Sequence, residues 1–304
     1  MTFRSGFVCV VGRPNTGKST LTNALVGTKV AITSEKPQTT RHAIRGIVHR
    51  PEGQIVLVDT PGIHRPKTLL GSRLNDLVRT AYADVDLIAM CFPADQPIGP
   101  GDRMISSDLA AMQRTPKIAL LTKTDLVPKK LLAERLVSIS KLAQNQEFEW
   151  TEIVPISSKS GENIDVLSEL LIKHLPEGPA LYPEDELSDS TTEKLISEFI
   201  REAALVGVSD ELPHSIAVIV EEMRLREGRP ANKPLMDISA FLFVERDSQK
   251  GIVIGKGGVR LRHVGEVARH QIEKHLGMKV FLDLRVKIAP DWQRDPKQLT
   301  RLGF

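Results

Sequence analysis

Cysteine is scarce in this sequence, with only Cys9 and Cys91 among 304 residues. Each stands in an apolar, strand-like stretch, so we expect two reduced core residues of a cytoplasmic protein. Metal or redox chemistry at these cysteines would require further ligands nearby, and the sequence gives no sign of them.

Long hydrophobic runs and a secretory signal are also missing. No stretch of about 18 apolar residues occurs, so no membrane span is expected. The first six residues lead directly into an apolar stretch and lack the features of a secretory signal. The composition, 41% hydrophobic and 26% charged, is that of a soluble globular protein, and 304 residues suffice for two domains.

The most informative stretch is residues 12–19, which read Gly-Arg-Pro-Asn-Thr-Gly-Lys-Ser. This is the G-x-x-x-x-G-K-S spacing of a phosphate-binding loop. An apolar, strand-like stretch precedes it and a helix-like stretch follows it, as the motif requires. We expect Lys18 to reach the β- and γ-phosphates of a nucleotide and the Ser19 hydroxyl to ligate Mg²⁺. The alternative, a glycine turn without a ligand, does not account for these flanks.

Strand-like and helix-like segments alternate from residue 1 to about 176. Expected strands are 7–11, 44–50, 54–59, 86–92, 117–122 and 151–157, and expected helices are 18–26, 68–83, 100–112, 128–144 and 163–174. This α/β pattern predicts a mostly parallel, doubly wound sheet with ligands at the carboxyl ends of its strands.

Asp59-Thr60-Pro61-Gly62 follows one of the expected strands. Asp59 can hold Mg²⁺ through water, and the Gly62 N–H can contact a γ-phosphate. D-x-x-G alone is a common turn, but its place after the phosphate-binding loop strengthens the functional interpretation. The polar residues 31–40 are predicted to be mobile, with Thr40 closing on Mg²⁺ when a γ-phosphate is present.

The base-binding segment is expected at Thr122-Lys123-Thr124-Asp125. A carboxylate at Asp125 can accept hydrogen bonds from N1–H and the 2-amino group of guanine, which adenine lacks, so an ATPase is disfavoured. The stem of Lys123 would cover the base. Ser157-Ser158-Lys159 follows a later strand and can offer backbone N–H groups to guanine O6, although the tripeptide alone carries no meaning.

Together these segments predict one nucleotide site, with Lys18, Thr40 and Gly62 as the catalytic residues and Ser19, Thr40 and Asp59 as the metal ligands. The residues predicted to bind the nucleotide are Gly12, Arg13, Pro14, Asn15, Thr16, Gly17, Lys18, Ser19, Thr20, Asp59, Thr60, Pro61, Gly62, Thr122, Lys123, Asp125, Ser157, Ser158 and Lys159.

Residues 177–190 are acidic and turn-rich and are predicted to be a linker. A second domain is expected over 191–304, with helices at 191–206 and 259–276, strands at 215–224, 236–245 and 279–288, and a short helix in the tail from 291. Between an apolar turn and the long helix lies a G-x-x-G loop. This order resembles a KH domain of the prokaryotic type, a smaller α+β fold that binds single-stranded nucleic acid.

The charge distribution agrees with an RNA-binding role. Nine Lys or Arg residues lie between 250 and 287, against three acidic residues. A solvated helix face would explain the charge run but not the glycines. The residues predicted to bind RNA are Ile254, Gly255, Lys256, Gly257, Gly258, Arg260 and Arg262.

In this order the motifs resemble translation-factor-class GTPases, and nearly the whole chain resembles the Era family of ribosome-assembly GTPases. The resemblance implies a switch that hydrolyses GTP slowly to GDP and phosphate. It also implies binding to small-subunit ribosomal RNA near its 3′ end during subunit assembly. The single phosphate-binding loop argues against tandem GTPases, and the absence of a terminal cysteine argues against tRNA-modifying GTPases.

Two residues depart from the family pattern. Thr122 replaces an Asn that bonds the base N7 and ties the base-binding loop to the phosphate-binding loop, and a threonine hydroxyl can supply part of this. Ser158 replaces an Ala, but its expected role is a backbone N–H, so little should change.

Hydrolysis is expected to need help. Ile63 stands where Ras-like enzymes carry a water-orienting glutamine, with His64 next. Asn15 stands where potassium-stimulated relatives carry a cation-ligating Asn, so K⁺ is a second candidate cofactor, held also by carbonyls of residues 33–37. The alternative is that Asn15 only tolerates a left-handed turn.

A competing hypothesis is a membrane-associated signalling GTPase whose second domain docks protein or anionic lipid. Under it, the chain would lie peripherally on the inner face of the cell membrane. The main hypothesis predicts a cytoplasmic monomer whose partners are GTP or GDP, ribosomal RNA and the small ribosomal subunit.

Overall fold

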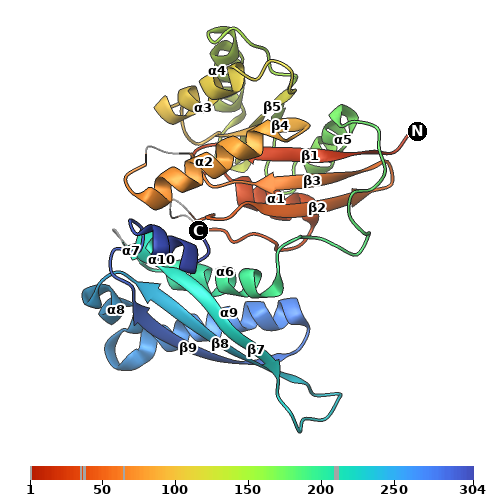
Figure 1. Cartoon of the computed structure of the whole chain (residues 1–304). Helices are drawn as coiled ribbons and strands as arrows, with labels where there is room; N and C mark the ends of the chain where they lie inside the picture. The colour runs from red at the N-terminus through yellow and green to blue at the C-terminus, as the bar shows by residue number, and fades with distance from the viewer. Residues whose placement is uncertain (1, 35, 37–38, 64–65, 209–211) are drawn as a thin grey trace. The chain divides into compact units, whose positions relative to one another are not determined.

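The computed structural model describes residues 2–34, 36, 39–63, 66–208 and 212–304. The chain forms two compact units (Figure 1). The first comprises Met1–Lys67 and Gly71–Asp189, and the second comprises Ser190–Phe304 together with Thr68–Leu70.

A six-stranded sheet forms the centre of the first unit, in the order β2-β3-β1-β4-β5-β6. Its strands are β1 (Arg4–Val11), β2 (Ile44–Arg50), β3 (Gly53–Asp59), β4 (Leu87–Pro93), β5 (Lys117–Thr122) and β6 (Glu152–Pro155). Only the β2–β3 pair is antiparallel. The predicted mostly parallel sheet is therefore confirmed, with β2 as an antiparallel edge strand.

Helices cover both faces of this sheet (Figure 1). They are α1 (Lys18–Val26), α2 (Leu69–Ala83), α3 (Pro100–Ala110), α4 (Lys129–Gln144) and α5 (Ile164–His174). Alternate residues of β1 belong to opposite cores: Val8 and Val10 pack in the cluster that contains α1 and α5, and Cys9 and Val11 pack in the cluster that contains α2, α3 and α4. Both cysteines are free and buried, as expected of core residues.

The predicted linker is bonded to the first unit along its length. The Ser5 hydroxyl donates to the Pro179 carbonyl at 2.6 Å. Further along, the buried Gln54 side chain accepts from the N–H groups of Leu181 and Tyr182 at 2.7 and 3.0 Å. The segment is thus an ordered strap rather than a loose connection.

The end of this strap lies beside the edge strand β2. Its Leu187 carbonyl accepts from the N–H of Ile47 at 2.9 Å. Asp189, the last residue of the first unit, forms an ion pair with Arg45 at 3.0 Å. The strap therefore partly covers the hydrogen-bonding edge that β2 would otherwise expose.

The second unit contains a three-stranded sheet in the order β7-β8-β9 (Figure 1). Its strands are β7 (Ala217–Leu225), β8 (Leu235–Val244) and β9 (Lys279–Ile288), and its helices are α6 (Thr192–Leu205), α7 (Leu212–Ser215), α8 (Asp247–Ile254), α9 (Val259–Leu276) and α10 (Pro296–Arg301). β8 pairs antiparallel with β7 and parallel with β9. This is the expected KH-type arrangement.

One expectation about the second unit is wrong: the apolar turn predicted before the G-x-x-G loop is the end of α8. The Gln249 side chain starts this helix by accepting from the backbone N–H groups of Glu245 and Arg246 at 2.9 and 3.1 Å. The short helix α7, just before β7, was also not predicted. Both helices are too short for a clear hydrophobic period.

Candidate nucleotide site and nucleic-acid interface

The phosphate-binding loop joins the end of β1 to the start of α1 and depends on residues with positive φ. A Cβ on Gly12, whose φ is +150°, would lie 2.9 Å from the Cys91 carbonyl oxygen. Asn15 has φ 62° and Gly17 has φ +90°. The first helical hydrogen bond runs from Leu21 N–H to the Gly17 carbonyl at 2.8 Å. The amides of residues 18–20 therefore precede the helical ladder, and a helix start of this kind suits an anion.

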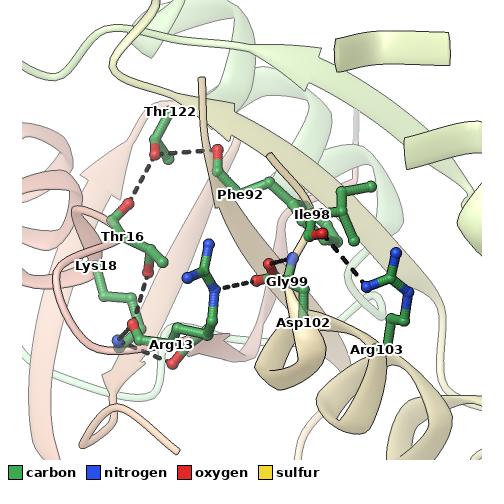
Figure 2. Close-up of polar contacts among 10 residues, drawn as sticks. Arg13, Thr16, Lys18, Phe92, Ile98, Gly99, Asp102, Arg103 and Thr122 are labelled. Atoms are coloured by element: carbon green, nitrogen blue, oxygen red, sulfur yellow. Dashed lines mark hydrogen bonds and ion pairs between the residues drawn. The ribbon is translucent and has the colours of Figure 1, made fainter. Parts of the chain in front are cut away.

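Lys18 is buried beneath this loop. Its Nζ donates to the carbonyls of Gly12 and Arg13 at 3.1 and 2.8 Å, as Figure 2 shows for the second bond. Burial lowers the pKa of Lys18, while the negative charge of Asp59 opposes that shift. The loop therefore holds a cationic group at the point where phosphate charge is expected.

Three oxygen-bearing side chains fit a magnesium ion. The Oγ of Ser19 and the Oγ1 of Thr40 lie 2.8 Å apart, close to the separation of about 2.9 Å between neighbouring octahedral ligands with Mg²⁺–O bonds of about 2.05 Å. Asp59 is fully buried, and neither carboxylate oxygen accepts a well-formed hydrogen bond from the described residues. Burial raises the pKa of Asp59 to about 6, and the Ser19 hydroxyl and Lys18 act in the opposite direction.

The segment after β3 packs directly on the phosphate-binding loop. A Cβ on Gly62 would lie 2.6 Å from the backbone nitrogen of Pro14, so only glycine fits without a shift. Ile63 is 3% exposed and belongs to the hydrophobic core beside Cys9 and Val11. Its side chain therefore cannot orient a water molecule, as expected.

Four residues of the expected site lie outside the described part of the chain, namely His64 and the loop residues Glu35, Pro37 and Gln38.

The Arg13 side chain has its partners at the start of α3. Its Nε donates to the Asp102 carboxylate at 2.8 Å, and the other Asp102 oxygen accepts from the Gly99 N–H at the start of α3 (Figure 2). A Cβ on Gly101 would lie 2.8 Å from the Arg13 Cδ. The Arg13 side chain thus anchors the loop to α3, and nucleotide binding by Arg13 stays a prediction for its backbone N–H.

Thr122 makes the connection expected of the residue that it replaces. Its hydroxyl donates to the Thr16 carbonyl in the phosphate-binding loop at 2.7 Å and also lies 3.2 Å from the Phe92 carbonyl (Figure 2). The tie between base-binding and phosphate-binding loops is therefore present without an asparagine.

The base-binding segment continues in η1 (Thr124–Leu126), a single 3-10 turn after Lys123, which has φ 59°. Oδ1 of Asp125 accepts from the Ser157 hydroxyl at 2.7 Å. The Ser157 N–H donates to the Glu162 carbonyl at 3.1 Å. Ser157 thus positions the carboxylate instead of offering its amide to guanine, which corrects the prediction and leaves the amides of Ser158 and Lys159.

In the second unit, the G-x-x-G loop forms the turn η2 (Lys256–Gly258) between α8 and α9. Gly255, Gly257 and Gly258 have φ of +71°, +61° and +77°, a conformation that favours glycine. A Cβ on Gly255 would lie 2.8 Å from the Arg260 Cβ. The loop therefore presents backbone with little side-chain cover.

The Arg260 side chain contacts the end of a helix in the same unit. Its guanidinium donates to the carbonyls of Ala204 and Val206 at the end of α6, at 3.3 and 2.8 Å, and to the Gly207 carbonyl at 3.3 Å. Carbonyls at a helix C-terminus favour a cation. Arg260 thus caps α6, and its contact with RNA stays a prediction.

A groove of about 440 Å³ lies between α9 and β9. Its lining residues are Gly258, Leu261, Arg262, Gly265, Glu266, Arg269, Val280, Phe281, Leu282, Asp283 and Leu284. β9 is last in the sheet order, so one backbone edge of it has no strand partner among the described residues. The groove combines backbone donors and acceptors with the guanidinium groups of Arg262 and Arg269.

Comparison with known proteins agrees with both units. Residues 7–123 match the family described as "50S ribosome-binding GTPase", and residues 211–293 match the KH domain family. GTPase Era of Mycobacterium sp. strain JLS is 64% identical over 303 residues, covering 99% of each chain. GTPase Era of Streptomyces coelicolor is 62% identical over 301 residues, covering 99% of this chain and 95% of that protein.

The chain belongs to the Era family of GTPases.

Two solved Era structures cover 99% of this chain and 99% of their own at 37% identity. One is Era in complex with MgGDPNP and nucleotides 1506–1542 of 16S ribosomal RNA, with a TM-score of 0.93. The other is a variant of Aquifex aeolicus Era bound to GDP and AlF4⁻, with a TM-score of 0.92. The Era fold thus extends through both units of this chain.

Proposed function

We propose that this Era-family GTPase binds 16S ribosomal RNA near its 3′ end and assists assembly of the small ribosomal subunit. The observation that carries the proposal is the match of both units to an Era structure that holds a GTP analogue and this RNA. The description of the matched GTPase family names the 50S subunit, but that match ends at residue 123, whereas the Era match covers both units.

For the nucleotide, the backbone N–H groups of residues 12–20, except Pro14, surround the phosphates, and Lys18 contacts the β- and γ-phosphate oxygens. Mg²⁺ would be held by the hydroxyls of Ser19 and Thr40 and, through water, by the Asp59 carboxylate. When bound, Mg²⁺ supplies positive charge to the phosphate oxygens. The Gly62 N–H donates to the γ-phosphate. When hydrolysis removes the γ-phosphate, this bond is lost and the segment that contains Gly62 is released from the phosphate-binding loop.

Asp125 selects guanine by accepting from its N1–H and 2-amino groups, and the stem of Lys123 lies over the base. The Ser157 hydroxyl, 2.7 Å from Asp125, keeps the carboxylate in one orientation. The Ser158 and Lys159 amides are the donors for O6. Thr60 and Pro61 shape the turn that carries Gly62.

Intrinsic hydrolysis is proposed to be slow because the Ile63 side chain is buried in the core, so that position offers no polar group to the attacking water. K⁺ bound by Asn15 would add positive charge between the phosphates. The left-handed conformation of Asn15 is compatible with this role and with the alternative that it serves the turn alone.

For RNA, the G-x-x-G loop lets the phosphate backbone approach closely, with Lys256 and Arg262 contributing charge. Bases enter the groove beside α9 and meet the unpartnered edge of β9. Ile254, at the end of α8, borders the loop.

We further propose that the protein acts as a monomer in the cytoplasm, the compartment in which ribosomal subunits assemble. The membrane-associated alternative has less support, because the second unit matches an RNA-binding family. No helix of the described residues is long and apolar enough to cross a membrane.

The test is to crosslink RNA to the full chain in cells and sequence it. Reads concentrated at the 3′ end of 16S ribosomal RNA are expected. Replacing both Lys256 and Gly257 with Asp should remove these reads and leave GTP binding intact. Reads spread evenly over cellular RNA would contradict the proposed target.

A further inference from the structure

The outward face of the sheet in the second unit carries one aromatic side chain that differs from its neighbours. Phe281 of β9 is 53% exposed. On the same sheet, the Phe241 ring is covered by the Lys287 ammonium, whose Nζ lies 3.2 Å from the ring centroid. Phe243 is buried, at 5% exposure. A single exposed phenylalanine requires no explanation, so the surroundings of Phe281 decide its meaning.

The Phe281 ring contacts a guanidinium that is paired with an aspartate. The Arg226 Cζ lies 5.2 Å from the centre of the ring. Both Asp237 oxygens hold this guanidinium, with Nε bonds of 3.1 and 3.0 Å and an Nη2 bond of 2.7 Å. Asp237 is also the cross-strand partner of Phe281 in the β8–β9 register. Arg226 lies two residues beyond Arg224, the register partner of Asp237 on β7, so its guanidinium contacts the Asp237–Phe281 pair from a diagonal position.

Of these three residues, Phe281 borders the groove. Phe281 is one of the groove-lining residues, as are Arg262 and Arg269 on the facing helix. On the same wall, the carboxylate of Asp283 is neutralised by Arg285 at 2.6 Å. Glu266 of the same lining opposes Arg262 and Arg269, so with the Asp283–Arg285 pair counted as neutral the groove carries one net positive charge, and Phe281 lies on its β9 wall.

We infer that Phe281 and Arg226 form a stacking platform for one unpaired base of the RNA that leaves the groove. Aromatic rings and guanidinium planes both stack on nucleobases and tolerate any base. An acidic peptide would use the charge but not the flat aromatic surface, so RNA is the occupant that uses both. The inference rests on the proposed RNA-binding function and extends that site by one nucleotide.

The test measures binding of the full chain to nucleotides 1506–1542 of 16S ribosomal RNA over a series of salt concentrations. Phe281→Ala should weaken binding about 5- to 150-fold, the equivalent of about 1–3 kcal/mol for one lost base stack. Phe281→Tyr should bind like the wild type. The slope of affinity against salt should not change in either variant, because no phosphate contact is lost.

Phe281→Leu keeps an apolar side chain without an aromatic ring, and it should weaken binding as Phe281→Ala does. Phe241→Leu is the matched control, since Phe241 does not line the groove, and it should leave affinity unchanged. Wild-type affinity in a folded Phe281→Ala or Phe281→Leu variant would overturn the platform.

A variant with Lys256 and Gly257 both replaced by Asp separates this inference from the proposed function. If that variant loses its RNA affinity and Phe281→Ala keeps the wild-type affinity, the proposed RNA site is supported and the stacking platform is refuted. If the wild type itself does not bind the RNA, the proposed function fails as well.

Discussion

At the scale of single residues, several predicted groups reach their roles through partners that sequence motifs do not reveal. Asp125 is oriented by the Ser157 hydroxyl, and Arg13 points to Asp102 instead of the nucleotide. Arg260 caps α6. Residues outside the motifs therefore set the orientation of the motif residues. Substitutions can distinguish a residue that binds the ligand from one that only orients it.

Asp125→Asn tests base selection. Asparagine presents an amide donor where guanine needs an acceptor, so we expect affinity for GTP to fall and affinity for xanthosine triphosphate, which has a carbonyl there, to rise. Competition binding with both nucleotides measures the change. Ser157→Ala is the companion variant. It should weaken GTP binding by about 1 kcal/mol without changing the preferred base, since it removes one hydrogen bond to Asp125. A GTP preference retained by Asp125→Asn would refute the assignment.

Asn15→Ala tests the monovalent cation. If Asn15 ligates K⁺, wild-type GTP turnover should be faster in KCl than in NaCl at equal ionic strength, and the variant should lose this difference. Should Asn15 serve only the left-handed turn, the wild type will turn over equally in both salts. The ribosomal subunit would then be the main candidate activator.

At the scale of elements, α9 contains a glycine that its own helix would not favour. Gly265 lies inside the 18-residue helix, faces the groove, and would have no atom within 4 Å of an added Cβ. A glycine within a helix costs about 1 kcal/mol relative to alanine. Its presence keeps space open in the groove wall.

Gly265→Ala is therefore expected to raise stability by about 1 kcal/mol and to lower RNA affinity, with a larger loss for Gly265→Leu. Urea unfolding and RNA titration measure the two effects. Gly251→Ala in α8 is the control, because it also has open space but does not line the groove. Equal RNA affinity in Gly265→Leu and wild type would show that RNA does not use this wall.

At the scale of the whole molecule, the strap of residues 177–189 is hydrogen-bonded to β2. This strand begins four residues after Thr40, one of the predicted magnesium ligands. β2 begins at Ile44, and its Arg45 and Ile47 bond the end of the strap. Gln54, on the neighbouring strand β3, bonds the strap at Leu181 and Tyr182. Gln54 is 1% exposed, so water cannot readily replace the strap as the hydrogen-bond partner of its side-chain amide.

Gln54→Ala should release this part of the strap. It removes the three hydrogen bonds that the Gln54 side chain makes to Leu181 and Tyr182, so we expect a loss of about 1–3 kcal/mol in the free energy of unfolding. Urea unfolding measures the loss, and limited proteolysis should show faster cleavage within residues 177–189. Gln96→Ala, an exposed site, is the control. Unchanged stability and cleavage would mean that the strap is held by its remaining contacts.

The sequence by itself determined what depends on local order: the phosphate-binding loop, the position of Asp125 just after a strand, the alternating first unit and the G-x-x-G loop before a long helix. Hydrophobic period and glycine spacing act over a few residues and are legible in one dimension. Only the tertiary structure decided the partners. Arg13 and Asp102 lie 89 positions apart, and Gln54 and Tyr182 lie 128 apart. Such pairs form because the folded chain brings distant polar groups together where burial makes an unpaired group costly, and no local pattern records that distance.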